Sequence, residues 1–252
     1  GLIWWENPID GVSVEKDFNG KGSVMAGIGD LAPENWSSNT EYAFFANAKA
    51  KISPAVEVTA AYMREHSDGT VEHNHAASWG TGAYWKKGAA DTWNRTAYNM
   101  GLFSLGVNAQ LSPKWSVIAE GVHNSEGDRV IGSTDGATSV TGRNAHKNGF
   151  WSRVNYGKLN WSKANTWQVY GEYFALGGSS IDSSGWGHRL NIAGGNGYGG
   201  DGVRGWGLGA SYMVADNTNF ELTYYKLKPY DQADAGFDSY ENTAYASLCF
   251  SF

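Results

Sequence analysis

Tyr-Ala-Ser-Leu-Cys-Phe-Ser-Phe, residues 245–252, is the stretch that decides the fold. Together with Ala244 it alternates strictly, so one face of an extended strand carries Ala244, Ala246, Leu248, Phe250 and Phe252. A terminal strand with an open edge and an aromatic tip is an aggregation hazard in water. A closed barrel in lipid removes that edge and places the outward rings at the bilayer interface. The stretch therefore predicts an all-β fold, a transmembrane antiparallel β-barrel.

The composition agrees with a barrel and excludes other classes. The chain of 252 residues has 34 Gly, 12 Trp, 14 Tyr and 10 Phe but only 17% charged residues, which suits curved strands with interfacial rings. The mean hydropathy of -0.44 excludes only helical spans, because half of each barrel strand faces water. Cys249 is the single cysteine, so no intrachain disulfide forms. The net charge of -6 argues against a nucleic-acid partner. No signal peptide is evident, so we expect a mature or trimmed chain.

Strands are expected wherever the alternation recurs, joined by connections that are alternately short and long. The expected strands are 10–18, 22–31, 40–52, 56–67, 97–111, 115–126, 148–161, 166–178, 203–215, 219–231 and 240–252. The short turns contain Asn-Gly, Ser-Pro and Asp-Asn pairs, which tight hairpins favour. The long connections are 32–39, 68–96, 127–147, 179–202 and 232–239. Barrels of outer membranes have the same asymmetry, with short periplasmic turns and long extracellular loops.

The alternation also predicts which side chains face lipid and which face the lumen. Val56, Val58 and Ala60 fall on the lipid face, whereas the positions between them are polar. Eight charged residues are expected to line the pore: Lys49, Lys51, Glu57, Glu65, Glu120, Arg153, Glu172 and Glu221. Fixed charges on such a wall set the ion preference of a channel. The alternative is that they only keep the lumen hydrated, with no role in a constriction.

Two segments invite a catalytic or metal-binding interpretation. His123 and Ser125 share a side of a strand end, loosely resembling the His-x-Ser-Asn-Gly motif of outer-membrane phospholipases, with Glu126 in place of the asparagine. The alternative is a polar strand end that enters a loop. A second set, His66, Glu72, His73 and His75, has donor types that suit zinc or copper. Histidines in a solvated loop need no metal, so we predict no catalytic, cofactor or metal site.

The C-terminal residues Tyr245, Phe250 and Phe252 resemble the assembly signal of bacterial outer-membrane barrels, with Ser247 where glycine is commoner. Together with the hairpin pattern they make the whole chain resemble the general porin family. The segment Asn7–Val14 followed by Phe18 is similar to strand openings of such porins, and to the barrel of the OmpM-type porins of diderm Firmicutes. Those porins carry an N-terminal surface-layer-homology domain that grips the cell wall.

The resemblance implies a 16-stranded barrel, usually a homotrimer, in the bacterial outer membrane. Its partners would be the bilayer, lipopolysaccharide, the assembly machinery and small hydrophilic solutes. Residues 1–252 supply 11 or 12 of these strands as one domain, so we expect N-terminal strands or an N-terminal periplasmic domain to be missing. The expected function is passive diffusion of ions and small solutes. The alternatives are a barrel that tethers the membrane to the wall, an autotransporter translocator and an outer-membrane hydrolase.

Overall fold

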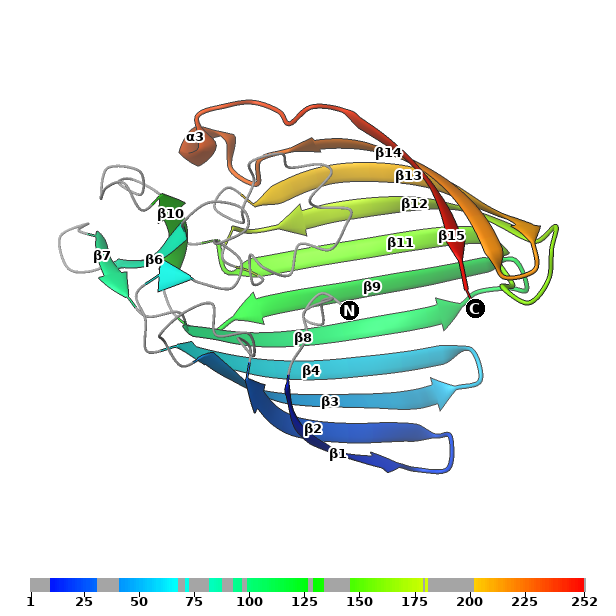
Figure 1. The fold of residues 1–252 in the computed structure, drawn as a ribbon, viewed down its shortest axis with the longest axis horizontal. Coiled ribbons are helices and arrows are strands. Elements are labelled where there is room, and N and C mark those ends of the chain that lie inside the picture. The colour runs from blue at the N-terminus through cyan, green and yellow to red at the C-terminus, as the bar shows by residue number, and fades with distance from the viewer. Residues whose placement is uncertain are drawn as a thin grey trace.

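The structure is a computed structural model that describes residues 10–30, 41–67, 71–72, 82–87, 93–96, 99–126, 129–133, 146–178, 180 and 202–251. Its main sheet is antiparallel throughout and has eleven strands in the order β1-β2-β3-β4-β8-β9-β11-β12-β13-β14-β15 (Figure 1). The first five are β1 (Asp10–Asp17), β2 (Gly22–Asp30), β3 (Glu41–Ser53), β4 (Val56–Ser67) and β8 (Asn99–Gln110). The others are β9 (Trp115–Asn124), β11 (Asn148–Lys158), β12 (Trp167–Leu176), β13 (Val203–Ala215), β14 (Thr218–Lys228) and β15 (Thr243–Phe250). The all-β fold and its eleven strands are as predicted.

The short turns have the backbone geometry that the sequence predicts. Asn19 and Gly20 have φ values of 55° and 74°, the left-handed pair that joins two twisted strands in a two-residue hairpin. The Asp17 Oδ1 accepts a hydrogen bond of 3.0 Å from the Gly20 N–H and holds this turn. Asn217, at the turn between β13 and β14, has φ 59°. These turns gather at one end of the sheet, which we call the short-turn rim (Figure 1).

Two of the predicted long connections contain strands that the sequence analysis missed. Strands β5 (Val71–Glu72), β6 (Gly82–Lys87) and β7 (Trp93–Thr96) follow β4, and β10 (Arg129–Ser133) follows β9. They form a separate small sheet, β10-β6-β5 with β7 paired to β6, at the end opposite the short-turn rim. A further correction is α3 (Gln232–Ala235), a four-residue helix in the connection 232–239. Among the described residues no helix is long and apolar enough to span a membrane.

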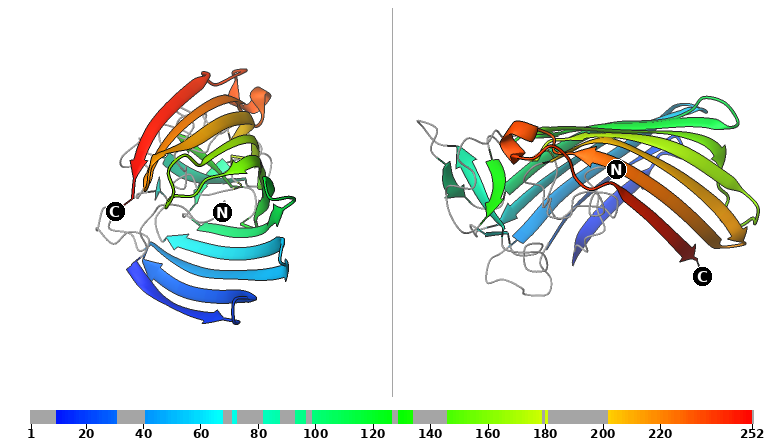
Figure 2. Two further views of the ribbon diagram at one scale, coloured as in Figure 1. Left: turned by 90° about the vertical axis from the view of Figure 1, so that its right-hand side faces the viewer. Right: turned by 90° about the horizontal axis from the view of Figure 1, so that it is seen from above.

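The main sheet curls strongly, with β1 and β15 at its two edges (Figure 2). The eleven strands do not close into a barrel, since no pairing joins β1 to β15 among the described residues. The reason is the odd strand number. In an antiparallel sheet of eleven strands, the first and last run in the same direction and cannot pair antiparallel.

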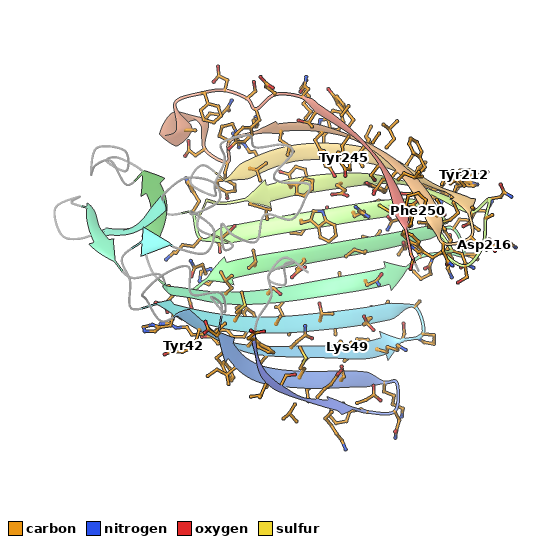
Figure 3. The ribbon with its side chains drawn as sticks, in the orientation of Figure 1. Tyr42, Lys49, Tyr212, Asp216, Tyr245 and Phe250 are labelled. Atoms are coloured by element: carbon orange, nitrogen blue, oxygen red, sulfur yellow. The ribbon has the colours of Figure 1, made fainter. Side chains whose placement is uncertain are left out.

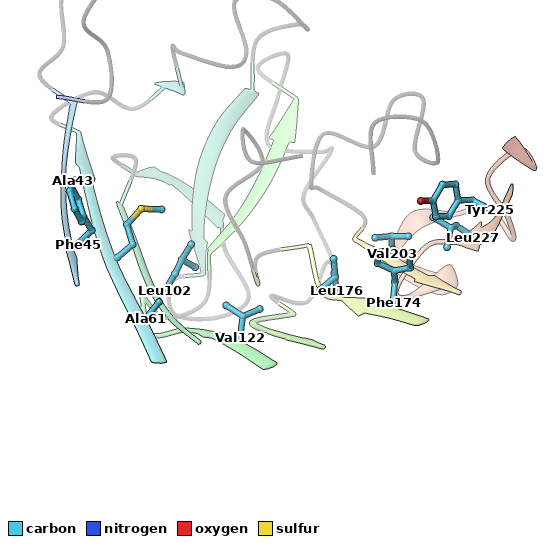
Figure 4. Packing of buried hydrophobic residues seen from close by; sticks show 11 residues of the cluster. Ala43, Phe45, Ala61, Leu102, Val122, Phe174, Leu176, Val203, Tyr225 and Leu227 are labelled. Carbon is cyan, nitrogen blue, oxygen red and sulfur yellow. The ribbon is translucent and has the colours of Figure 1, made fainter. Parts of the chain in front are cut away.

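The concave face is not polar throughout, which corrects the prediction of a wet interior. A cluster of buried hydrophobic side chains lies on this face, toward the end opposite the short-turn rim (Figure 4). Its members include Ala43, Phe45, Met63, Leu102, Val122, Phe174, Leu176, Val203, Tyr225 and Leu227. Met25, Trp151 and Tyr240 pack against it. The polar part of the concave face is therefore confined mainly to the half nearer the short-turn rim.

Candidate functional site

The two faces of the sheet differ in chemistry because side chains alternate along each strand. On β13, Gly207, Gly209 and Ser211 are buried on the concave face, whereas Leu208 and Tyr212, which alternate with them, are exposed on the convex face. The same alternation on β14 buries Thr223 and Tyr225 and exposes Leu222 and Tyr224. The convex face is thus apolar and open, and Figure 3 shows side chains on both sides of the curved ribbon.

Aromatic side chains border the convex face at both ends. Near the short-turn rim lie Trp115, Tyr156, Trp167, Tyr212 and Phe220, with ring centroids 4.8 Å apart for Trp115 and Tyr156 and 5.7 Å apart for Tyr156 and Trp167. Near the opposite end lie Tyr42, Phe44, Phe103, Phe150, Tyr173, Trp206 and Tyr224. Tyr42 and Tyr212, labelled in Figure 3, mark the two borders. Between the borders the exposed side chains are aliphatic, among them Val154, Val169, Leu208 and Leu222.

The two aromatic borders lie six residues apart on three successive strands, as Phe150 to Tyr156, Trp167 to Tyr173 and Trp206 to Tyr212 show. Six residues of strand correspond to about 20 Å, and the rings extend that spacing at both ends. Membrane-spanning barrels carry an apolar band about 25 Å tall between two aromatic girdles. The convex face therefore has the chemistry and the scale of a lipid-facing surface.

Three of the eight predicted pore-lining residues lie together on β3 and β4. Lys51 and Glu57 are opposite each other in the register. Lys49, two residues before Lys51 on β3, faces the same side. Both lysine side chains are exposed, and within the described part of the chain neither forms an ion pair. Glu65 pairs with Ala43 through the backbone, and its side chain lies outside the described ones. Two exposed ammonium groups, with the Glu57 carboxylate opposite one of them, therefore mark this side of the concave face.

Arg153 and Glu172, two further predicted residues, form an ion pair across β11 and β12. The Glu172 side chain is fully buried, and the Arg153 side chain is 13% exposed. Trp151 Nε1 donates a hydrogen bond of 3.2 Å to Glu172 Oε2, so both carboxylate oxygens have donors. The Arg153 guanidinium also lies 3.8 Å from the centroid of the Tyr170 ring, at cation–π distance. These contacts keep the Arg153 guanidinium close to the concave surface of the sheet.

Glu221 joins the same cluster through Tyr170, whose hydroxyl donates a hydrogen bond of 2.5 Å to Glu221 Oε1. The Tyr170 ring lies across Gly209 on the neighbouring strand, where an added Cβ would come within 2.1 Å of the ring. Tyr225 lies in the same way across Gly207. Glycine at these two positions lets the rings lie flat on the sheet. We call Trp151, Arg153, Tyr170, Glu172 and Glu221 the Arg153 cluster.

Glu120, the remaining predicted residue, is 7% exposed and lies opposite Trp151 in the register of β9 and β11. It therefore borders the Arg153 cluster. Trp151 and Tyr170 were not predicted as site residues. The signal for Tyr170 was available in the alternation, since it precedes Glu172 by two positions and so shares its face.

The structure gives His123 and Ser125 separate partners. His123 Nδ1 lies 2.8 Å from Asn148 Oδ1 on the exposed side of β9, whereas Ser125 Oγ donates a hydrogen bond of 3.0 Å to the Gly101 carbonyl. Glu126 forms an ion pair with Arg64. None of these contacts joins the imidazole to the serine hydroxyl. These contacts explain His123 and Ser125 as polar residues at the end of a strand.

The predicted donor set for a metal is only partly described. His66 stacks near Tyr42, with ring centroids 5.1 Å apart, and His73 and His75 lie outside the described residues. Among the side chains that the structure describes, no group of three or more His, Cys, Asp or Glu residues is arranged to hold a metal ion. Of the residues predicted to form an assembly signal, Tyr245 and Phe250 lie on β15, half-buried and exposed respectively, and Phe252 lies outside the described residues.

No family model and no curated protein matches the sequence. Among solved structures, the FpvAI–pyocin S2 complex has a TM-score of 0.40 and 13% identity over 95% of this chain and 31% of that chain. The pyoverdine outer membrane receptor FpvA from Pseudomonas aeruginosa PAO1, bound to pyoverdine, has a TM-score of 0.39 and 13% identity over 97% of this chain and 36% of that chain. The chain thus spans about a third of the length of these chains. TM-scores of this size do not establish a shared fold, so nothing about the receptors transfers to this chain.

Proposed function

We propose that the chain forms the wall of a porin in the bacterial outer membrane, a water-filled channel for passive diffusion of ions and small hydrophilic solutes. The observation that carries the proposal is the opposition of the two faces. The convex face is aliphatic between two aromatic borders, whereas the concave face carries charged side chains on the same strands. A curved sheet with this distribution separates lipid from water. No chemical step, metal or cofactor enters this function.

A closed wall needs more strands than the eleven that the structure describes in the main sheet. An antiparallel barrel has an even number of strands, so closure would require an odd number of further strands between β1 and β15. In the porin family such barrels have 16 strands and assemble as trimers, and we propose both for this protein. The bilayer, lipopolysaccharide and the assembly machinery that reads Tyr245, Phe250 and Phe252 would be its partners.

The charges of the concave face suggest how the channel would bias its ions. Arg153 and Glu172 neutralise each other, and Tyr170 binds the carboxylate of Glu221. Lys49 and Lys51 instead present exposed ammonium groups on β3. Because a low-dielectric wall strengthens the field of an unpaired charge, these two lysines should attract anions into this part of the lumen.

The test is single-channel conductance of the purified full-length protein in a planar bilayer, with the reversal potential measured under a salt gradient. Stepwise openings, three to a unit if the protein is trimeric, are expected. The double variant Lys49→Glu/Lys51→Glu should shift the reversal potential toward cation selectivity. The matched variant Lys163→Glu, on a turn outside the lumen, should leave it unchanged. A protein that inserts and stays silent would refute diffusion and favour a barrel that tethers the membrane to the wall.

A further inference from the structure

A shallow hollow of about 550 Å³ indents the apolar convex face where β2, β3, β4 and β8 lie side by side. Its floor consists of Gly22, Ala48, Ala50 and Ala60, none of which has a side-chain atom beyond Cβ. Phe18, Val24 and Leu105 stand around it, and each is exposed. The hollow therefore presents an apolar surface that other parts of the protein leave uncovered.

The register explains why bulk is missing at this place. Val24, Ala48, Ala60 and Leu105 are successive partners across four strands, so two methyl groups lie between two branched side chains. Two residues nearer the short-turn rim on each strand, Gly22 pairs with Ala50. The result is a short furrow open toward the short-turn rim.

Lys21 lies at the rim end of this furrow and lines its mouth. Its backbone is fixed, because its N–H donates to the Phe18 carbonyl at 3.2 Å and its own carbonyl accepts from the Lys51 N–H at 2.8 Å. The side chain is exposed and makes no ion pair within the described part of the chain. Asp17, the acid in the same turn, uses Oδ1 to accept the Gly20 N–H. The backbone of Lys21 is thus fixed at one end of the apolar furrow, and its side chain is exposed there.

The rest of the short-turn rim carries further lysines beside the carboxylate of Asp216. Lys114, Lys158 and Lys163 are exposed there, whereas Asp216 accepts a hydrogen bond of 2.7 Å from the Ala164 N–H. This basic rim contrasts with the net charge of -6 for the chain. A negatively charged partner suits this end of the molecule.

We propose that the furrow seats one acyl chain of an anionic phospholipid, and that the Lys21 ammonium binds its phosphate. The proposal rests on the proposed function, since only an embedded barrel presents its convex face to lipid. An apolar furrow gains free energy by covering its surface with methylene groups, and an ammonium group binds phosphate as a point charge. A water-soluble polyanion would use the ammonium group and leave the furrow empty.

Native mass spectrometry of the purified full-length protein tests this, with phosphatidylglycerol and phosphatidylcholine of identical acyl chains as probes. Lys21→Gln should weaken phosphatidylglycerol binding about fivefold, the loss expected for one lysine at an anionic surface. It should weaken phosphatidylcholine binding less, because the choline ammonium offsets the charge of the phosphate that both lipids carry. Ala48→Leu fills the furrow and should weaken both lipids. The matched controls are Lys163→Gln, another rim lysine, and Ala210→Leu, an outward alanine on β13. Both controls should bind like the wild type.

The outcomes separate this proposal from the proposed function. An equal loss in Lys163→Gln would mean diffuse attraction to the whole rim and would overturn the specific seat. A change of oligomer mass in Ala48→Leu would place a second copy in the furrow and would also overturn it. A wild type that conducts in planar bilayers but shows no preference for phosphatidylglycerol would refute the lipid seat alone. A wild type that never enters bilayers would refute the proposed function.

Discussion

Replacing Arg153 with methionine should be one of the most destabilising single changes on the concave face. The substitution keeps most of the side-chain volume and removes the charge that compensates Glu172. Because the Glu172 side chain is fully buried, its carboxylate would lose the positive charge that compensates it in a site away from water. Breaking a buried pair in this way costs about 3–5 kcal/mol of the free energy of unfolding.

The double variant Arg153→Met/Glu172→Leu removes both charges and should recover most of that loss, because well-packed apolar side chains replace buried ion pairs at little cost. The matched control is Arg64→Met. Its partner is Glu126, and the two side chains are 38% and 17% exposed, so the loss should stay at about 0.2–1 kcal/mol. Urea unfolding in lipid vesicles, followed by tryptophan fluorescence, gives the free energies of unfolding of the wild type, these three variants and the single variant Glu172→Leu, which completes the double-mutant cycle.

The coupling between Arg153 and Glu172 decides the interpretation. A coupling of at least about 2 kcal/mol agrees with a dry, compensated pair on the wall. A value near zero, with Arg153→Met no worse than Arg64→Met, would mean that water reaches Glu172 freely. The Arg153 cluster would then be part of the open lumen, and Glu172 would not be buried away from water.

Three further changes test other parts of the structure. Leu208→Arg, in the middle of the convex face, should cost about 2–4 kcal/mol of unfolding free energy in vesicles, and a loss near zero would contradict contact with lipid. Gly209→Ala should displace the Tyr170 ring, since the new Cβ would lie 2.1 Å from it, and should therefore make thermal unfolding faster. Thermal unfolding no faster than that of the wild type would contradict this. Gly20→Ala, at φ 74°, should cost about 1–2 kcal/mol in the same urea assay, whereas Gly121→Ala, whose Cβ would meet nothing closer than 3.9 Å, should cost less.

The main sheet was predictable because its physics is local. Alternation identifies strands such as β13, and turn residues such as Asn19 and Gly20 mark where each hairpin reverses. The small sheet was missed because its strands have two to six residues, too few for a period of two to stand out in a segment rich in glycine and serine. The helix α3 has four residues and no amphipathic period to detect.

Less of the candidate site was predictable. Alternation places Arg153 and Glu172 on one face, but the sequence does not reveal that the register sets them opposite each other. The contact of Tyr170 with Gly209 depends on pairing between β12 and β13, which a single strand's pattern does not contain. The hydrophobic cluster on the concave face was missed for a related reason. Inward residues such as Leu102 and Val122 were expected to be rare, because the pattern was interpreted with a uniformly wet lumen in mind.

The strand order also has a consequence for how such a chain folds. Each neighbour in the main sheet is the next strand of that sheet along the chain, so the strands can zip together hairpin by hairpin. Only at β4–β8 and β9–β11 must the chain first pass through strands of the small sheet. Pairings of this kind close short loops and give rapid, local steps. Sealing a complete wall would instead bring its first and last strands together, and β1 and β15 alone are already more than 200 residues apart. We therefore expect sealing to be the slow step of folding, during which the bare backbone of β1 and β15 is vulnerable to pairing with other chains.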